Sequence, residues 1–236
     1  FPDVENVVDV QNLHQDEAKQ SGGASGKQNA AQSKASTNKV YIVCTKEQLD
    51  ENSSLMIFSL IDKLSAELSV AKDIEQKKSL LMRRAIAHSV LRDFEAAISD
   101  FTYYISLDEK SSLAYWQRAV CQAEMDEFNR AEGKGITNIH SAEADFSDAI
   151  RLSSNNAYIY YNRGNVHAGR NELSKAIDDY SIAIRIDSRL AEAYYNRGLA
   201  RIKSGNKQAG IQDLSKAGEL GLYDAYSVIK RINKAK

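Results

Sequence analysis

Two consecutive stretches of equal length decide the fold of this chain. Residues 157–190 read AYIYYNRGNVHAGRNELSKAIDDYSIAIRIDSRL, and residues 191–224 read AEAYYNRGLARIKSGNKQAGIQDLSKAGELGLYD. Aromatic, small and charged residues recur at matching positions, as in the Asn-Arg-Gly triplet at 162–164 and again at 196–198. A repeat period of about 34 residues is typical of a helix–turn–helix unit. The sequence therefore predicts helical hairpins arranged in tandem.

The same pattern extends toward the N-terminus with one irregularity. Arg118-Ala119 and Arg84-Ala85 repeat the arrangement of Arg163-Gly164, in which Arg precedes a small residue. The spacing from Arg84 to Arg118 equals the period, whereas the spacing from Arg118 to Arg163 exceeds it. We therefore predict four units and number the positions in each from 1 to 34; the units span residues 78–111, 112–156, 157–190 and 191–224.

The second unit is longer than the other three, and we place the insertion near 129–140, which read NRAEGKGITNIH. One interpretation is a neutral lengthening of a surface loop, which costs little loop-closure entropy. The alternative is a loop that carries function.

Small and large residues occupy fixed positions of the units. Position 8 is always Ala or Gly, position 20 is always Ala or Gly, and position 24 is always large. A large side chain facing small ones allows two helices to interlock closely. We expect the core contacts at positions 8, 20, 24 and 27, for example at Gly164, Ala176, Tyr180 and Ala183.

These residues resemble the tetratricopeptide repeat family over 78–224. The resemblance implies an all-α fold, a right-handed superhelical solenoid of helix–turn–helix repeats. The chain departs from the family pattern in having Arg at position 7, Tyr104 at position 27 of the first unit, and no closing Pro at position 32. Four copies in phase still agree on the fold.

The segments that flank the repeats have different compositions. Residues 1–38 are polar and aperiodic, which predicts a flexible tail or linker. Residues 39–77 are expected to form an N-terminal segment with a capping helix that starts at Ser53 or Ser54. Residues 225–236 are expected to form a C-terminal capping helix. Because the first residue is Phe, we expect a processed or truncated product, and nothing in the sequence indicates a compartment.

Composition argues against several classes of function. A net charge of −1 offers no electrostatic basis for nucleic-acid binding. We expect no membrane span, because no apolar run approaches about 18 residues. Two cysteines, Cys44 and Cys121, are too few for a disulfide framework. His88 and His167 lie far apart with no further ligands at metal-binding spacing, so we expect no metal and no cofactor.

Arg at position 7 and Asp at position 23 occur together in all four units. A catalytic interpretation would require four identical active sites, whereas a structural ion pair between the two helices explains the recurrence simply. Arg suits that role because its planar guanidinium can bind a carboxylate through two nitrogens. We therefore expect no catalytic residues and no enzymatic activity.

The resemblance implies that positions 2, 5, 9 and 12 of each first helix line a concave groove that holds a peptide. Positions 5 and 9 are largely apolar and aromatic here, and position 6 supplies two asparagines whose amides can bond a peptide backbone. The alternative is that this row packs against neighbouring helices or the tail of the same chain. The predicted partner-binding residues are Met82, Ile86, Trp116, Val120, Tyr161, Asn162, Asn165, Tyr195, Asn196 and Leu199.

These patterns together predict a non-catalytic module for protein–protein interaction, with a protein or peptide partner. Family members that clamp a C-terminal carboxylate use a set of Lys, Asn and Arg residues, of which only Asn162 is present among five positions. Two alternatives stay open: a self-association module, and the assembly arm of an enzyme or regulator whose catalytic part lies outside this chain.

Overall fold

The computed structural model describes residues 49–133 and 139–234, and these contain ten α-helices and no strand. No helix within these ranges combines the length and the apolar character needed to cross a membrane. The all-α class predicted from the sequence is confirmed. The helices are α2 (Glu51–Val70), α3 (Ile74–Val90), α4 (Phe94–Leu107), α5 (Ser112–Ala131), α6 (Ile139–Leu152), α7 (Ala157–Gly169), α8 (Leu173–Ile186), α9 (Ala191–Lys203), α10 (Lys207–Glu219) and α11 (Asp224–Lys234).

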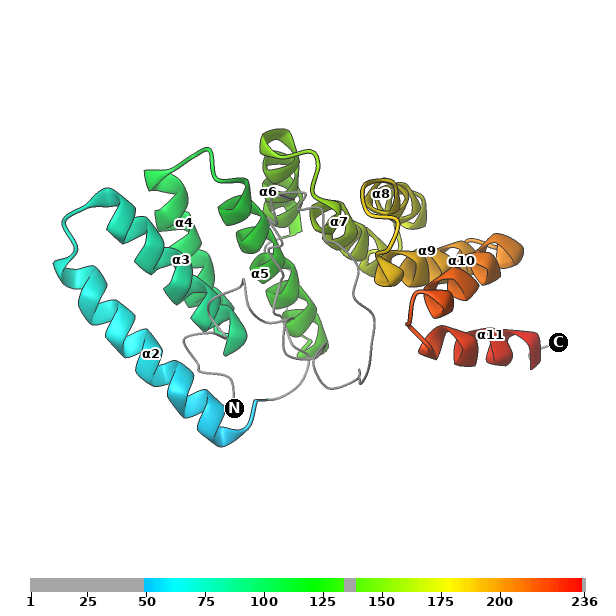
Figure 1. The fold of residues 1–236 in the computed structure, drawn as a ribbon, viewed down its shortest axis with the longest axis horizontal. Helices are drawn as coiled ribbons and strands as arrows, with labels where there is room; N and C mark the ends of the chain where they lie inside the picture. Colours follow the sequence, from blue (N-terminus) through cyan, green and yellow to red (C-terminus); the bar gives the residue numbers. More distant parts are fainter. Residues whose placement is uncertain (1–48, 134–138, 235–236) are drawn as a thin grey trace, which may run out of the picture. The chain divides into compact units, whose positions relative to one another are not determined.

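The chain divides into two compact units, Phe1–Leu107 and Asp108–Lys236, which we call the N-terminal and C-terminal units. Helices α2, α3 and α4 belong to the N-terminal unit, and helices α5 to α11 belong to the C-terminal unit (Figure 1). The predicted insertion lies partly outside the described residues, as does the predicted tail at 1–38.

In the N-terminal unit, α3 and α4 form a hairpin and α2 packs against α3. The prediction that Ser53 or Ser54 caps the first helix is wrong, because both lie inside α2. The N-cap of α2 is Asp50, whose Oδ1 accepts a hydrogen bond from Ser53 N at 2.8 Å. Helix α3 likewise begins at Ile74, one turn before the predicted start of the first unit. Both corrections have one cause, because an Asp side chain caps each helix upstream of its apolar pattern.

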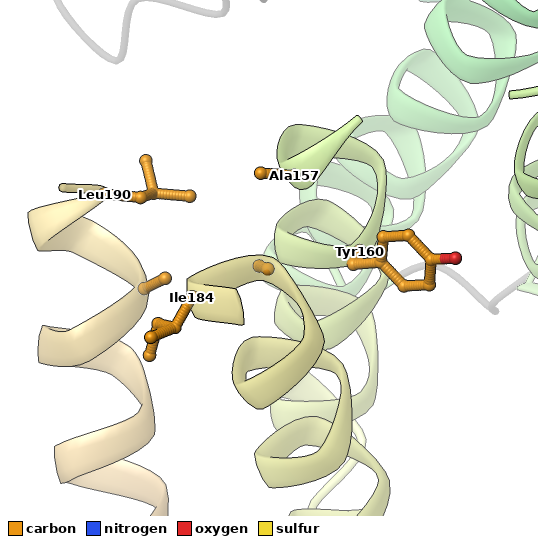
Figure 2. Packing of buried hydrophobic residues seen from close by; sticks show 6 residues of the cluster. Ala157, Tyr160, Ile184 and Leu190 are labelled. Atoms are coloured by element: carbon orange, nitrogen blue, oxygen red, sulfur yellow. The ribbon is translucent and has the colours of Figure 1, made fainter. Parts of the chain in front are cut away.

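In the C-terminal unit, α5–α6, α7–α8 and α9–α10 form three successive hairpins, and α11 packs against α10. Neighbouring hairpins touch through α6–α7 and α8–α9. Figure 2 shows one junction, where Ala157 and Tyr160 of α7, Ile184 of α8 and Leu190 before α9 belong to one buried cluster. Each hairpin thus buries apolar surface against the next, as repeat proteins do.

Close helix contacts explain the small residues at positions 8 and 20. A Cβ atom on Gly164 would lie 2.7 Å from Tyr180 Cε1. A Cβ atom on Gly198 would lie 2.9 Å from the carbonyl oxygen of Gly210, and one on Gly210 would lie 2.6 Å from that of Gly198. Because such distances leave no room for a side chain, α7 and α8, and likewise α9 and α10, approach one another only through glycine at these positions.

The predicted Arg–Asp pairs are confirmed in all four hairpins. Each arginine donates through Nε and Nη2 to both carboxylate oxygens of its partner, at 2.6 to 2.9 Å. Hydrogen bonding to the aspartate raises the pKa of the arginine in three of them. The pairs are Arg84–Asp100, Arg118–Asp145, Arg163–Asp179 and Arg197–Asp213.

In the C-terminal unit, each of these arginines also lies over a tyrosine ring one turn earlier on its own helix. The guanidinium carbons of Arg118, Arg163 and Arg197 lie 5.5 to 5.8 Å from the ring centroids. The aspartate side chains are only 5 to 7% exposed. The pairs therefore join the two helices of each hairpin in a partly buried setting.

Candidate functional site

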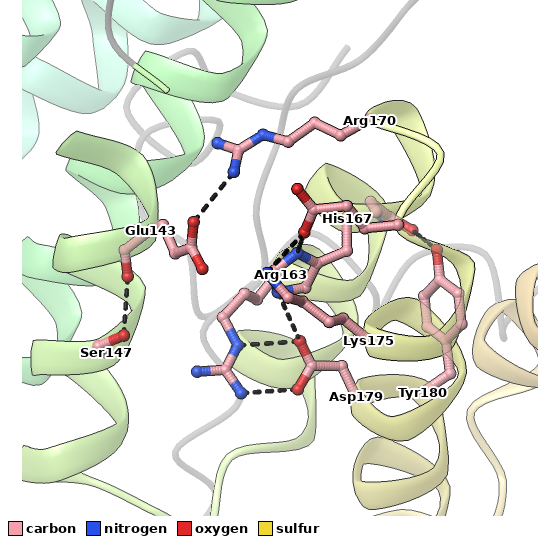
Figure 3. A network of polar contacts seen from close by, with 10 residues as sticks. Glu143, Ser147, Arg163, His167, Arg170, Lys175, Asp179 and Tyr180 are labelled. Carbon is pink, nitrogen blue, oxygen red and sulfur yellow. Dashed lines mark hydrogen bonds and ion pairs between the residues drawn. The ribbon is translucent and has the colours of Figure 1, made fainter. Parts of the chain in front are cut away.

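Side chains at the predicted positions 5, 6 and 9 contact one another directly between α7 and α9. Asn196 Nδ2 donates to the Tyr161 hydroxyl oxygen at 3.2 Å and to Asn165 Oδ1 at 2.9 Å. The Tyr180 hydroxyl from α8 donates to the same Asn165 oxygen at 2.8 Å, and Figure 3 shows the Tyr180 end of this network. The contacts bring three of the predicted binding residues together on two successive first helices.

Tyr161 contributes to the core as well as to this network. Its ring packs against two buried clusters and lies 6.0 Å from the Tyr180 ring, centroid to centroid. Burial raises the pKa of both tyrosine hydroxyls, so both stay protonated at neutral pH. Position 5 therefore adds to the predicted core positions 8, 20, 24 and 27, because Tyr161 packs against buried residues of its own hairpin and of the next one.

A second contact joins α5 and α7, with different residues. Trp116, at position 5 of α5, is 1% exposed, and its ring stacks on Tyr158 of α7 with 6.5 Å between centroids. Val120, at position 9, is also buried. The Trp116 Nε1 atom and the Asn162 Nδ2 atom are buried and have no hydrogen-bond partner. Trp116 and Val120 therefore pack inside the junction of α5 and α7 and are not accessible on the predicted surface.

The remaining predicted residues lie in different surroundings. Tyr195 is half-buried and packs against a cluster from α10 and α11, whereas Leu199 is 38% exposed. Met82 is half-buried and Ile86 is buried; both lie on α3 and are described within the N-terminal unit alone. The structure therefore assembles the candidate surface from α5, α7 and α9.

A polar cluster next to this surface has a structural role. Arg170 Nη1 lies 3.0 Å from Glu143 Oε2 and so joins α6 to the end of α7 (Figure 3). His167 Nδ1 lies 2.9 Å from Glu172 Oε2, and its Nε2 lies 3.7 Å from Asp179 Oδ2. Among the residues that the structure describes, no group of three or more His, Cys, Asp or Glu side chains is placed to hold a metal ion.

Sequence reasoning missed Tyr158, which stacks on Trp116 from the neighbouring hairpin. The sequence does distinguish Tyr158, because it is the only aromatic residue at position 2 of the four units. The equivalent residues in the other units are Ser79, Leu113 and Glu192. Position 2 lies one helical turn before position 6. Residues four apart share a face of a helix, so Tyr158 and Asn162 could have been grouped from the sequence.

The successive hairpins and their shared core define an all-α helical repeat protein of the solenoid class. Two family models match within the C-terminal unit, one described as "TPR repeat" over residues 169–205 and one as "Tetratricopeptide repeat" over 191–220. Residues 169–220 of the chain therefore contain tetratricopeptide repeat sequence. No curated protein matches the sequence.

Solved structures with similar folds include other tetratricopeptide repeat proteins. The crystal structure of MamA is 21% identical, with a TM-score of 0.61 over 76% of this chain and 99% of that chain. The fragment "MamA 41-end" from Desulfovibrio magneticus RS-1 is 14% identical, with a TM-score of 0.54 over 71% and 94%. YrrB, described as "a TPR protein with an unusual peptide-binding site", is 14% identical, with a TM-score of 0.57 over 76% and 89%. These likenesses establish the fold.

Proposed function

We propose that this chain is a non-catalytic interaction module that binds an extended peptide segment of a partner protein across α5, α7 and α9. The observation that carries the proposal is the direct contact of Tyr161 and Asn165 with Asn196. Because these bonds cross from one hairpin to the next, they support a continuous row of position-5, 6 and 9 side chains. The tetratricopeptide fold, which generally serves as a non-catalytic interaction module, supports the same conclusion.

The row has the composition of a protein-interaction surface. Tyr161 and Tyr195 are half-buried, so each presents an edge while its ring stays fixed by packing. Leu199 adds an apolar side chain that is 38% exposed. Rigid aromatic side chains lose little entropy on binding, and those at the centre of an interface commonly contribute about 2 kcal/mol or more each. The peptide-binding site ascribed to YrrB adds support from a protein of similar fold.

The test uses a linear dodecapeptide library displayed on phage and selected on the full chain. Leu199→Glu should lower the affinity for the selected peptides at least tenfold, because it places a charge in the apolar row without disturbing a buried residue. Tyr223→Glu is the matched control, since Tyr223 is an exposed aromatic side chain, 73% accessible, outside the row. The Tyr223→Glu variant should bind the peptides with the same affinity as the unmodified chain.

Two results would contradict the proposal. The first is a library that yields no binding peptide, and the second is a set of peptides that bind Leu199→Glu and the unmodified chain equally. Light scattering on the same proteins tests the rival function. A dimer that Leu199→Glu dissociates would assign the row to self-association in place of peptide binding.

A further inference from the structure

We propose that Arg231 on α11, together with the lysines around it, binds a carboxylate on an extended acidic segment of a partner protein. This surface lies at one end of the last hairpin and uses none of the side chains in the row of positions 5, 6 and 9, so the inference does not depend on the proposed function. It follows from an arginine of the repeat that has no aspartate partner among the described residues.

Arg231 occupies the position that binds a carboxylate in every hairpin. Counting on from the fourth unit places it at position 7 of α11, which corresponds to Arg84, Arg118, Arg163 and Arg197. Each of those four donates through Nε and Nη2 to both oxygens of an aspartate. Arg231 is exposed and has no hydrogen-bonded or ion-paired partner within the described part of the chain. Its guanidinium is therefore open to a carboxylate from another molecule.

Helix α10 offers the further contact that such an arginine makes. Arg84 and Arg197 each donate from Nη1 to a serine on the preceding helix, Ser65 or Ser181, at 3.0 Å. Ser215 stands on α10 where Ser181 stands on α8. Both hydroxyls donate to a backbone carbonyl four residues earlier, so their oxygens can accept a bond from a guanidinium. The Ser215 hydroxyl can thus position the α11 guanidinium while its other nitrogens bind the carboxylate.

Cations gather around this position. Lys203 ends α9 and Lys207 begins α10, and Lys207 Nζ donates to the carbonyl oxygen of Ile232 in α11 at 3.1 Å. The three helix ends therefore lie together. Lys230 and Lys234 are exposed on α11, as are Lys203 and Lys207 on their own helices. A group of exposed cations at one end of the unit attracts a segment that carries several negative charges.

The repeat does not require these lysines. In the first unit the residues equivalent to Lys203 and Lys207 are Val90 and Phe94, which are buried. No Asp or Glu occurs from 199 to 212 to neutralise the two lysines. The last hairpin thus has a cationic surface at two positions that serve packing in the first hairpin.

The residue after Arg231 determines the form of the partner. Position 8 is Ala or Gly in all four hairpins but Ile232 in α11. In the last hairpin a Cβ atom on Gly198 would lie only 2.9 Å from the carbonyl oxygen of Gly210, so a second helix could not approach a branched side chain as closely. An extended segment needs no such approach, because a long acidic side chain can reach Arg231 from it.

A carboxylate suits this surface better than the phosphates of a nucleic acid. The four arginine–aspartate pairs show that position 7 accommodates a carboxylate. The chain as a whole has a net charge of −1, which gives no general attraction for a long polyanion. A short acidic segment needs only the local group of cations.

The test measures the binding of fluorescein-labelled hexaglutamate to the full chain by fluorescence anisotropy at low ionic strength. Arg231→Gln should lower the affinity about tenfold. Arg231→Lys, which keeps the charge but loses the planar contact through two nitrogens, should lower it at least threefold. Arg185→Gln, which changes an exposed arginine in the last turn of α8, should alter the affinity less than twofold. Because both arginines are exposed, all variants should keep the Tm of the unmodified chain.

Three results would overturn the site. The first is no binding of hexaglutamate, and the second is equal binding by Arg231→Lys and the unmodified chain, which would show attraction by charge alone. The third is an oligothymidine that binds more tightly than hexaglutamate and depends on Arg231, which would assign the cations to nucleic acid. None of these results would affect the proposed function, which is tested with library-selected peptides and Leu199→Glu.

Discussion

Replacing Arg163 by Ala should destabilise the protein by about 3 to 5 kcal/mol, because it removes both short hydrogen bonds to a buried carboxylate. The neighbouring His167 Nε2 lies 3.7 Å from Asp179 Oδ2, too far to replace them. Asp179 accepts hydrogen bonds from Arg163 Nε at 2.9 Å and Nη2 at 2.6 Å, and its side chain is 5% exposed. Each hydrogen bond that involves a charged group contributes roughly 1.5 to 3 kcal/mol. Two such bonds, together with the desolvated charge left behind, give the expected range.

The reverse substitution should cost less. Arg163 is 22% exposed and its guanidinium carbon lies 5.8 Å from the Tyr160 ring centroid, so in Asp179→Ala it keeps access to water and its contact with the ring. We therefore expect a loss of about 1.5 to 3 kcal/mol for Asp179→Ala. The double variant should be more stable than the sum of the two losses predicts, by about 1 to 3 kcal/mol.

Urea unfolding of the four proteins measures this coupling free energy, provided that circular dichroism and tryptophan fluorescence give coincident transitions. The control is Arg151–Asp148 on α6, a pair in which the two side chains are 66% and 40% exposed. Its coupling should be about 0.5 kcal/mol or less. If the Arg163 and Asp179 losses add within about 0.3 kcal/mol, the recurrence of the pair has a cause other than mutual stabilisation.

Two further predictions concern Tyr180. Gly164→Ala should destabilise by about 1 to 3 kcal/mol in urea, because the added carbon would lie 2.7 Å from the Tyr180 ring, whereas Gly169→Ala, with no atom within 4 Å, should be neutral or stabilising. Burial raises the pKa of Tyr180 above the unfolded value, so the unfolded chain ionises first and stability should fall above about pH 10 by roughly 1.4 kcal/mol per pH unit for this tyrosine. Tyr180→Phe should reduce that slope in urea titrations between pH 8 and 11, and an unchanged slope would show that Tyr180 does not contribute.

The repeat period predicted the hairpins because each position has the same packing environment in every copy. The Arg–Asp pairs were predictable for the same reason, since Arg197 and Asp213 recur at the positions of Arg163 and Asp179. The helix starts at Glu51 and Ile74 were not predictable from the period, because each depends on one N-cap residue that lies outside the repeat, Asp50 or Asp73.

The candidate site was predictable only in part. The positions that face the next hairpin follow from the period, and Tyr161, Asn165 and Asn196 do meet. Whether a side chain stays accessible or packs into the core depends on its neighbours across the junction, which the period does not describe. Trp116 is accordingly buried although it occupies the same position as the half-buried Tyr161.

The arginines that join the two helices of each hairpin also influence the order in which the C-terminal unit should unfold. Two nitrogens of Arg197 hold Asp213 within its own hairpin, while the third, Nη1, donates to Ser181 of the preceding helix at 3.0 Å; Arg170 and Glu143 link the hairpins at the earlier boundary. The bidentate arginine–aspartate bonds thus lie inside the hairpins, where they join the two helices of each unit. Amide hydrogen exchange should therefore proceed in blocks, each hairpin opening as one cooperative step and the terminal α11 opening first.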